Sequence, residues 1–92
     1  MIIKELKIWT EYLDDVLKGI KTFELRNNDK DFRDNEIVVL KEYNPYSQTY
    51  LSRKVYIKIL KVYKDLEKFG LKKGFCIFTF EILMRSLGVL GD

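Results

Sequence analysis

The chain has no histidine among its 92 residues, and it has one cysteine and one proline. Histidine is the commonest general base and a frequent zinc ligand, so its absence excludes Ser-His and Cys-His nucleophile pairs and the usual zinc sites. The single cysteine, Cys76, cannot form an intramolecular disulfide, and its apolar neighbours in GFCIFTF indicate a buried thiol. Any chemistry would depend on lysine, carboxylate, hydroxyl or backbone groups, and we expect neither a metal nor a cofactor.

Long apolar runs and a signal sequence are also missing. No run approaches the roughly 18 residues that a membrane span needs, and MIIKELKIW lacks the apolar stretch and cleavage site of a signal peptide. We therefore expect a cytoplasmic protein without membrane contact. Hydrophobic residues make up 47% and charged residues 34%, which is typical of one globular domain, here spanning 1–92.

Charge is spread unevenly along the chain. The net charge is +3, but residues 53–73 carry eight basic and two acidic side chains, a local balance of +6. This balance favours a polyanionic partner, although a lysine-rich strand face is often only a solvated surface. Three lysines of this segment are candidate contacts for nucleic-acid phosphates: Lys54, Lys58 and Lys61.

Hydrophobic periodicity predicts a strand, a helix and then further strands. The helix is expected over about 11–18, with Thr10 as its N-cap and Gly19 at its C-terminal end. A short helical turn is expected over 65–70, and residues 84–92 should form a tail that is either loose or packed back. The strands are expected over about 2–8, 22–27, 36–43 and 50–63, and after Gly74.

Alternation within these strands predicts the core. Phe23 and Leu25 are expected to anchor the core, with Glu24 and Arg26 on the opposite face of their strand. Arg53 falls on the apolar parity of its strand, so either a bulge turns it outward or it points into a polar pocket. The other expected core residues are Phe32, Leu51, Val55, Ile57, Ile59, Cys76, Phe78, Phe80 and Ile82. The element order favours an α+β fold with a small barrel of about five to six strands.

One motif is similar to that of a known family. The spacing Gly19-x-Lys21-x-x-Glu24-x-Arg26 resembles the G-x-K-x-x-E-x-R signature of the ASCH superfamily, which has a PUA-like β-barrel fold. The runs KELKIWTEYLDDVLKGIKTFELRNNDKDF, EIVVLKEYNP and LKKGFCIFTFE extend the likeness over about residues 4–82, to an uncharacterised phage and bacterial branch. Four positions depart from that branch, which usually has histidine, proline, glycine and glycine there: Lys4, Thr10, Asn35 and Ser52.

The resemblance implies that the motif lines a ligand-binding cleft between the barrel and its helix. Arg26 would read an anion or a base edge, and Glu24 would accept from an exocyclic amine or hold its two neighbours in place. Lys21 can reach Glu24 only if the turn at Gly19 delivers it before the strand begins. The candidate ligand contacts are Lys7, Trp9, Lys21, Glu24, Arg26, Asn28, Asp29 and Arg53.

These residues also have purely structural interpretations. Glu24 and Arg26 could form an ordinary surface ion pair, since they are two residues apart on one strand face. Trp9 could anchor the core instead of stacking on a base. Asn28 could cap the amides of its own loop.

Three functions remain open from the sequence. The leading one is a non-catalytic module that binds RNA or a nucleotide-like ligand in the ASCH cleft, as ASCH proteins are generally regarded as RNA binders. The alternative is a small amidohydrolase acting on acylated cytidine nucleosides, in which Lys21 would be the catalytic lysine. Against it, Glu24 stands where that ASCH branch has a threonine. The third is a phage protein that binds a host protein. The sequence does not define an oligomeric state.

Overall fold

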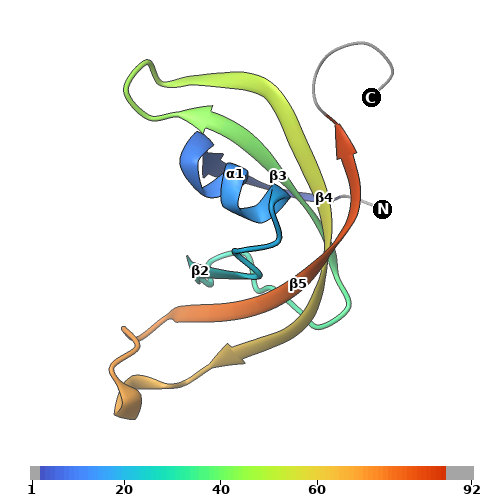
Figure 1. Ribbon diagram of the computed structural model, residues 1–92. Helices are drawn as coiled ribbons and strands as arrows, with labels where there is room; N and C mark the ends of the chain where they lie inside the picture. Colours follow the sequence, from blue (N-terminus) through green and yellow to red (C-terminus); the bar gives the residue numbers. More distant parts are fainter. Residues whose placement is uncertain (1–2, 87–92) are drawn as a thin grey trace.

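The computed structural model describes residues 3–86, which form a five-stranded sheet with one helix on its concave side (Figure 1). The elements are β1 (Lys4–Trp9), α1 (Thr10–Leu17), β2 (Phe23–Asn27), β3 (Ile37–Asn44), β4 (Thr49–Lys64), the 3-10 turn η1 (Glu67–Phe69) and β5 (Phe75–Ser86). The α+β class, the helix after the first strand and the helical turn near 65–70 are confirmed.

The strands follow the order β1-β3-β4-β5-β2 across the sheet. β1 runs parallel to β3, and all other neighbours are antiparallel. Register shifts near Tyr56 and Leu60 mark irregularities in the β4–β5 pair, where bulges increase the local twist. The sheet curls into a half-barrel, which brings its edge strands β1 and β2 within side-chain reach of each other beside α1 (Figure 1).

The core fills the concave side of the sheet. Its fully buried side chains come from α1, β3, β4 and β5: Leu13, Val16, Val38, Leu40, Val55, Ile57, Ile59, Cys76 and Phe78. Phe32 is buried and packs its ring against Phe78 at a centroid distance of 5.1 Å, so it fixes the β2–β3 loop as predicted. Leu51 is a wrong prediction: it is exposed because the β3–β4 hairpin projects past the core at that end (Figure 1).

The C-terminal cap of α1 was predicted correctly, whereas its N-cap was not. Gly19 adopts a φ of 75°, and the amides of Gly19 and Ile20 donate to Val16 O (3.0 Å) and Asp15 O (2.9 Å). This is a Schellman motif, which confirms the predicted C-terminal cap. Thr10 is not the N-cap, because it is already the first helical residue and its hydroxyl donates to Glu42 instead of to a helix amide.

The alternation of β2 into an apolar and a charged face is as predicted, but the prediction that the apolar face meets the core is wrong. Glu24 is 4% exposed, whereas Phe23 and Leu25 are 46% and 52% exposed. Glu24 pairs with Phe78 on β5, and directly opposite residues of an antiparallel pair share a face. Because Phe78 is a core residue, the charged side of β2 faces the concave side of the sheet. The apolar side chains of β2 face outward.

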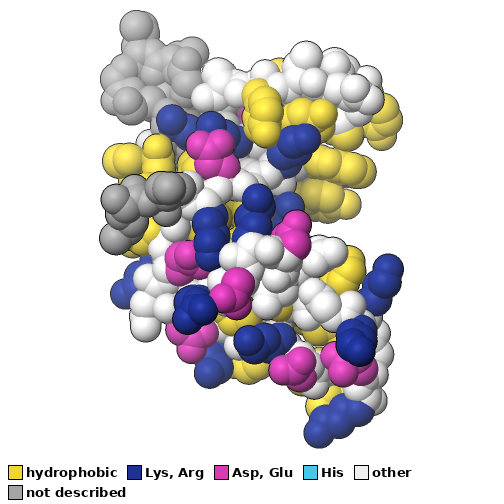
Figure 2. Space-filling view, turned by 180° about the vertical axis from the view of Figure 1, so that it is seen from behind, with side chains coloured by type: hydrophobic (Ala, Val, Ile, Leu, Met, Phe, Trp, Pro, Cys, Tyr) yellow, Lys and Arg dark blue, Asp and Glu magenta, His cyan; other side chains and the backbone are white. Residues whose placement is uncertain are grey.

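The C-terminal strand extends further than predicted. β5 continues through residues 84–86, so the expected tail does not begin there; positions 87–92 of that tail, and the expected strand start at position 2, lie outside the described residues. Basic and acidic side chains are interspersed on the face seen in Figure 2. Within residues 3–86 no helix has the length and apolar character needed to cross a membrane.

Candidate functional site

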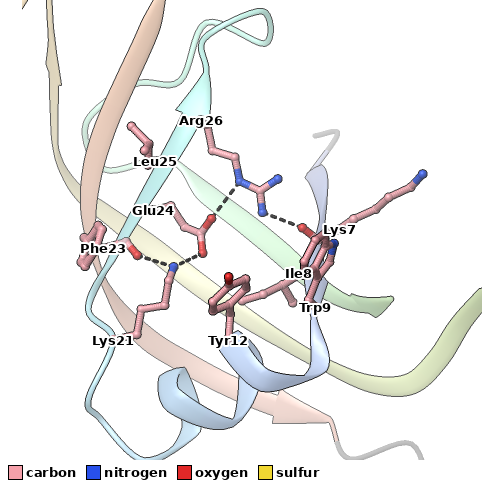
Figure 3. A pocket seen from close by; sticks show the side chains of 9 residues that line it. All are labelled: Lys7, Ile8, Trp9, Tyr12, Lys21, Phe23, Glu24, Leu25 and Arg26. Atoms are coloured by element: carbon pink, nitrogen blue, oxygen red, sulfur yellow. Dashed lines mark hydrogen bonds and ion pairs between the residues drawn. The ribbon is translucent and has the colours of Figure 1, made fainter. Parts of the chain in front are cut away.

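A pocket of about 330 Å³ lies where β1, α1 and β2 meet, and we call it the seam pocket (Figure 3). Its volume is at the lower end of the range of about 300–1,000 Å³ found for small-molecule sites. Most of its surface is apolar. The lining residues are Lys7, Ile8, Trp9, Tyr12, Lys21, Phe23, Glu24, Leu25 and Arg26.

Lys21, Glu24 and Arg26 form a charged triad on one side of this pocket. The Glu24 carboxylate accepts from Lys21 Nζ at 2.5 Å through Oε1 and from Arg26 Nε at 2.8 Å through Oε2. Lys21 Nζ also donates to the carbonyl of Phe23 at 2.7 Å. Both carboxylate oxygens therefore have partners, and this compensates the burial of Glu24.

Lys21 reaches Glu24 because it precedes β2. The strand begins at Phe23, so Lys21 lies in the turn after Gly19 and is not bound by strand alternation. The sequence predicted that Lys21 can reach Glu24 only if the turn at Gly19 places it before the strand, and this is what the structure shows. The three charged residues of the motif converge on one pocket.

Arg26 also links the two edges of the sheet. Its Nη2 donates to the carbonyl of Lys7 on β1 at 2.6 Å. β1 and β2 are the terminal strands of the sheet within the described residues, so no ladder of backbone hydrogen bonds joins them there. A side chain, and not backbone pairing, thus spans the seam.

Trp9 and Tyr12 form the opposite wall. Their ring centroids are 5.9 Å apart with planes inclined by 23°, and the side chains are 42% and 45% exposed. The interpretation of Trp9 as a core anchor is therefore wrong. Tyr12 was not among the predicted contacts. Its position three residues after Trp9, in the first turn of a predicted helix, is the signal that places both rings on one side.

Four predicted contacts have side chains that do not join the triad: Lys7, Asn28, Asp29 and Arg53. Lys7 Nζ lies 4.4 Å from the ring centroid of Tyr43, and its side chain points away from the triad, so only its backbone carbonyl contacts Arg26 (Figure 3). Asn28 Oδ1 accepts from the Phe32 amide at 2.9 Å, which makes it a cap of its own loop. Asp29 is exposed beside a neighbouring hollow.

Arg53 does not line the seam pocket. Its Nε and Nη2 donate to the two oxygens of Glu42 at 3.0 and 2.9 Å, and Nη2 also donates to Asp14 at 2.9 Å. Arg53 lies within a register irregularity of the β3–β4 pair, but its side chain points into a polar cluster, which is the second of the two alternatives. The cluster ties α1 to β3 and β4.

Charges within this second cluster reinforce one another. The hydrogen bond from Arg53, with that from Thr10, holds the pKa of Glu42 below its ordinary value of 4.5 despite burial. The hydrogen bond to Glu42 in turn raises the pKa of Arg53. Such a bidentate guanidinium–carboxylate pair is a strong structural contact. We assign the Arg53 cluster to stability.

The three lysines predicted to contact phosphates lie on β4, the middle strand of the sheet, and do not line the seam pocket. Lys61 pairs with Asp34 at 3.5 Å, and Lys54 Nζ lies 5.7 Å from the ring centroid of Tyr56. Lys58 lies in register with Glu81 on β5. The structure therefore does not bring these side chains together with the triad.

Other reactive groups are few in the part of the chain that the structure describes. There, no group of three or more His, Cys, Asp or Glu side chains is arranged to hold a metal ion. Cys76 is fully buried, and this burial raises the pKa of its thiol. A buried thiol of this kind is a packing residue and not a nucleophile.

Comparison with known proteins gives a family without an assigned activity. A protein-family model described as "Domain of unknown function (DUF3850)" matches residues 3–80, a range that includes the whole seam pocket. No curated protein matches the chain. Since the match covers most of its length, the chain belongs to the DUF3850 family.

Proposed function

We propose that the protein is a non-catalytic module that binds RNA or a nucleotide-like ligand, with a base held in the seam pocket. The observation that carries the proposal is the half-exposed Trp9–Tyr12 stack, which faces the charged triad across an apolar pocket. Stacking of a base on an aromatic side chain contributes about 1–3 kcal/mol. A base combines a flat apolar face with a polar edge, and the pocket offers a surface for each.

The triad can recognise the polar edge of a base. Each oxygen of Glu24 accepts one hydrogen bond, which leaves acceptor capacity for an exocyclic amine. Lys21 and Arg26 retain N–H groups for carbonyl or ring-nitrogen acceptors. The mutual ion pairs hold all three side chains in place before the ligand arrives, which lowers the entropy cost of binding.

The sequence adds two supporting observations. The Gly19-x-Lys21-x-x-Glu24-x-Arg26 spacing resembles the ASCH motif, whose proteins are regarded as RNA binders. The local balance of +6 over residues 53–73 would attract an anionic ligand at long range. Because the lysines of this segment lie outside the seam pocket, the proposal rests on the pocket itself.

Tryptophan fluorescence gives a direct test, because Trp9 is the single tryptophan of the chain. The protein would be titrated with the four ribonucleosides, their 5′-monophosphates and short single-stranded RNAs at several salt concentrations. We expect saturable quenching, and Tyr12→Ala should weaken binding about tenfold. Tyr63→Ala removes a similarly exposed tyrosine from β4 and should change nothing. Absence of quenching by every probe at low salt would refute the proposal.

Hydrolysis of acylated cytidines is the alternative. A lysine acting as general base must accept a proton, whereas Lys21 Nζ donates to Glu24 and to the carbonyl of Phe23. This geometry favours holding a ligand over cleaving it. Incubation with an N-acylated cytidine, followed by chromatography, should release no cytidine. Release that disappears in Lys21→Ala would overturn the non-catalytic assignment.

A further inference from the structure

A second hollow of about 880 Å³ lies next to the seam pocket and shares Lys7 and Arg26 with it. We call it the basic basin, because four basic and two acidic residues line it. Its lining comprises Ile3, Lys4, Glu5, Leu6, Lys7, Arg26, Asn27, Asp29, Lys30 and Tyr50. One of the two carboxylates, that of Glu5, is already paired with Lys41 at 2.9 Å. The basin therefore has a positive balance of charge.

Arg26 has donors left for the basin. Its Nε and Nη2 bind Glu24 and the Lys7 carbonyl, whereas Nη1 has no hydrogen-bond partner among the described residues. Figure 3 shows this third nitrogen pointing away from Glu24. A guanidinium presents five N–H groups in a planar fork that matches the oxygens of a phosphate. Arg26 thus lines both hollows, with Nε and Nη2 engaged and Nη1 available as a donor.

Lys30 is the second available cation. It is exposed in the loop that follows β2 and makes no hydrogen bond or ion pair within residues 3–86. By contrast, Lys4 pairs with Glu36 at 2.8 Å, and the ammonium of Lys7 lies over the ring of Tyr43. An anion in the basin would therefore be bound mainly by Arg26 and Lys30.

We propose that the basic basin binds a phosphate of the ligand whose base occupies the seam pocket. This inference rests on the proposed function and narrows it: the ligand is a phosphorylated nucleoside, either a nucleotide or RNA, and not a free nucleoside. Base and phosphate lie on the two sides of Arg26. The arrangement uses the same guanidinium to fix Glu24 beside the base and to donate to the phosphate.

The test compares ligands that differ only in phosphate, with Trp9 fluorescence as the readout. A nucleoside 5′-monophosphate is expected to bind about tenfold more tightly than the matching nucleoside, because hydrogen bonds between charged groups are stronger than neutral ones. Inorganic phosphate should compete with the monophosphate. A dinucleoside monophosphate, which has only an internal phosphate, distinguishes the phosphate of an RNA chain from a terminal one. Nucleoside and monophosphate binding with equal affinity would overturn the inference while leaving the proposed function intact.

Two variants separate a built subsite from general charge attraction. Lys30→Ala should reduce the preference for the monophosphate over the nucleoside about threefold. Lys73→Ala removes the same charge from an exposed site between η1 and β5 and should leave that preference unchanged. Arg26→Lys keeps the charge but loses the fork, so it should also lose the preference, with circular dichroism checking that it folds. Equal effects of Lys30→Ala and Lys73→Ala would contradict the inference, and quenching by neither ligand class would refute both proposals.

Discussion

Glu24 lies directly opposite Phe78 in the antiparallel β2–β5 pair, so a nearly buried carboxylate and a fully buried ring share the concave face of the sheet. This face of β2 meets the core on one side and the seam pocket on the other. Its charges are tolerated there because Lys21 and Arg26 neutralise Glu24 with short hydrogen bonds. The charged side chains of β2 therefore form the polar edge of the hydrophobic core, beside the seam pocket.

Truncation of the outward-facing apolar side chains of β2 should cost little. We expect Leu25→Ala to lower the free energy of unfolding by less than about 1 kcal/mol, because Leu25 is half-exposed. Leu40→Ala makes the same change at a fully buried site and should cost about 2–5 kcal/mol. Urea denaturation measures both. A large loss for Leu25→Ala would show that β2 faces the other way.

The Glu42–Arg53 contact should stabilise the fold only above acidic pH. In the folded protein the pKa of Glu42 lies below its ordinary value of 4.5, so its contribution is present above that pH and is lost as the pH falls through the folded value. The free energy of unfolding of Glu42→Gln should therefore be about 1–3 kcal/mol lower than that of the unsubstituted protein at neutral pH, and the difference should shrink on acidification.

Urea denaturation from pH 7 down to about pH 3 would follow this difference across the expected range. The exposed Glu67 on η1 offers a matched control, since Glu67→Gln makes the same change at a surface site and should alter the free energy of unfolding by less than about 0.5 kcal/mol at neutral pH. A difference between Glu42→Gln and the unsubstituted protein that stays constant with pH would contradict the assigned role of Arg53.

The cap at the end of α1 should be sensitive to backbone conformation alone. A methyl group added at Gly19 meets nothing within 4 Å, but the φ of 75° is unfavourable for residues with a Cβ atom. We expect Gly19→Ala to lower the free energy of unfolding by about 1–2 kcal/mol. Gly19→Asn should cost less, because asparagine tolerates the left-handed region. Equal losses for the two variants in thermal or urea unfolding would contradict this explanation.

Cys76 should report opening of the core. Its side chain is fully buried and its pKa is raised, so a thiol reagent should react with the native protein far more slowly than with the unfolded chain. Absorbance assays of thiol labelling would measure both rates. Leu40→Ala should raise the logarithm of the native-state labelling rate in proportion to its loss of stability. Native labelling as fast as that of the unfolded chain would disprove burial of the thiol.

Local patterns predicted the elements well but could not orient all of them. Alternation along β2 defines two faces, yet the face that meets the core is set by pairing with β5, far along the chain. Hydrophobicity predicted that Phe23 and Leu25 face the core. In the structure Glu24 faces the core instead, and its ion pairs compensate the burial of its charge. The five residues of β2 do not by themselves determine its register with β5.

Dependence on distant partners also explains why the role of Arg53 was not predicted. Its apolar parity correctly signalled something unusual, but its partners Glu42 and Asp14 are 11 and 39 residues away in sequence. By contrast, the convergence of Lys21 with Glu24 depends on a turn of a few residues, and the glycine that makes this turn was visible in the sequence. Local geometry was predictable, and tertiary partners were not.

The half-barrel leaves backbone groups along the edges of β1 and β2 free of ladder partners within the described residues, and such edges tend to recruit strands from other molecules. β2 is only five residues long, and its inward-pointing Glu24 and Arg26, with Lys7 on the facing strand, oppose that recruitment. Apolar substitutions at Glu24 or Arg26 would thus favour edge-to-edge association between molecules. The side chains that are proposed to recognise the ligand therefore also protect the open edges of the sheet.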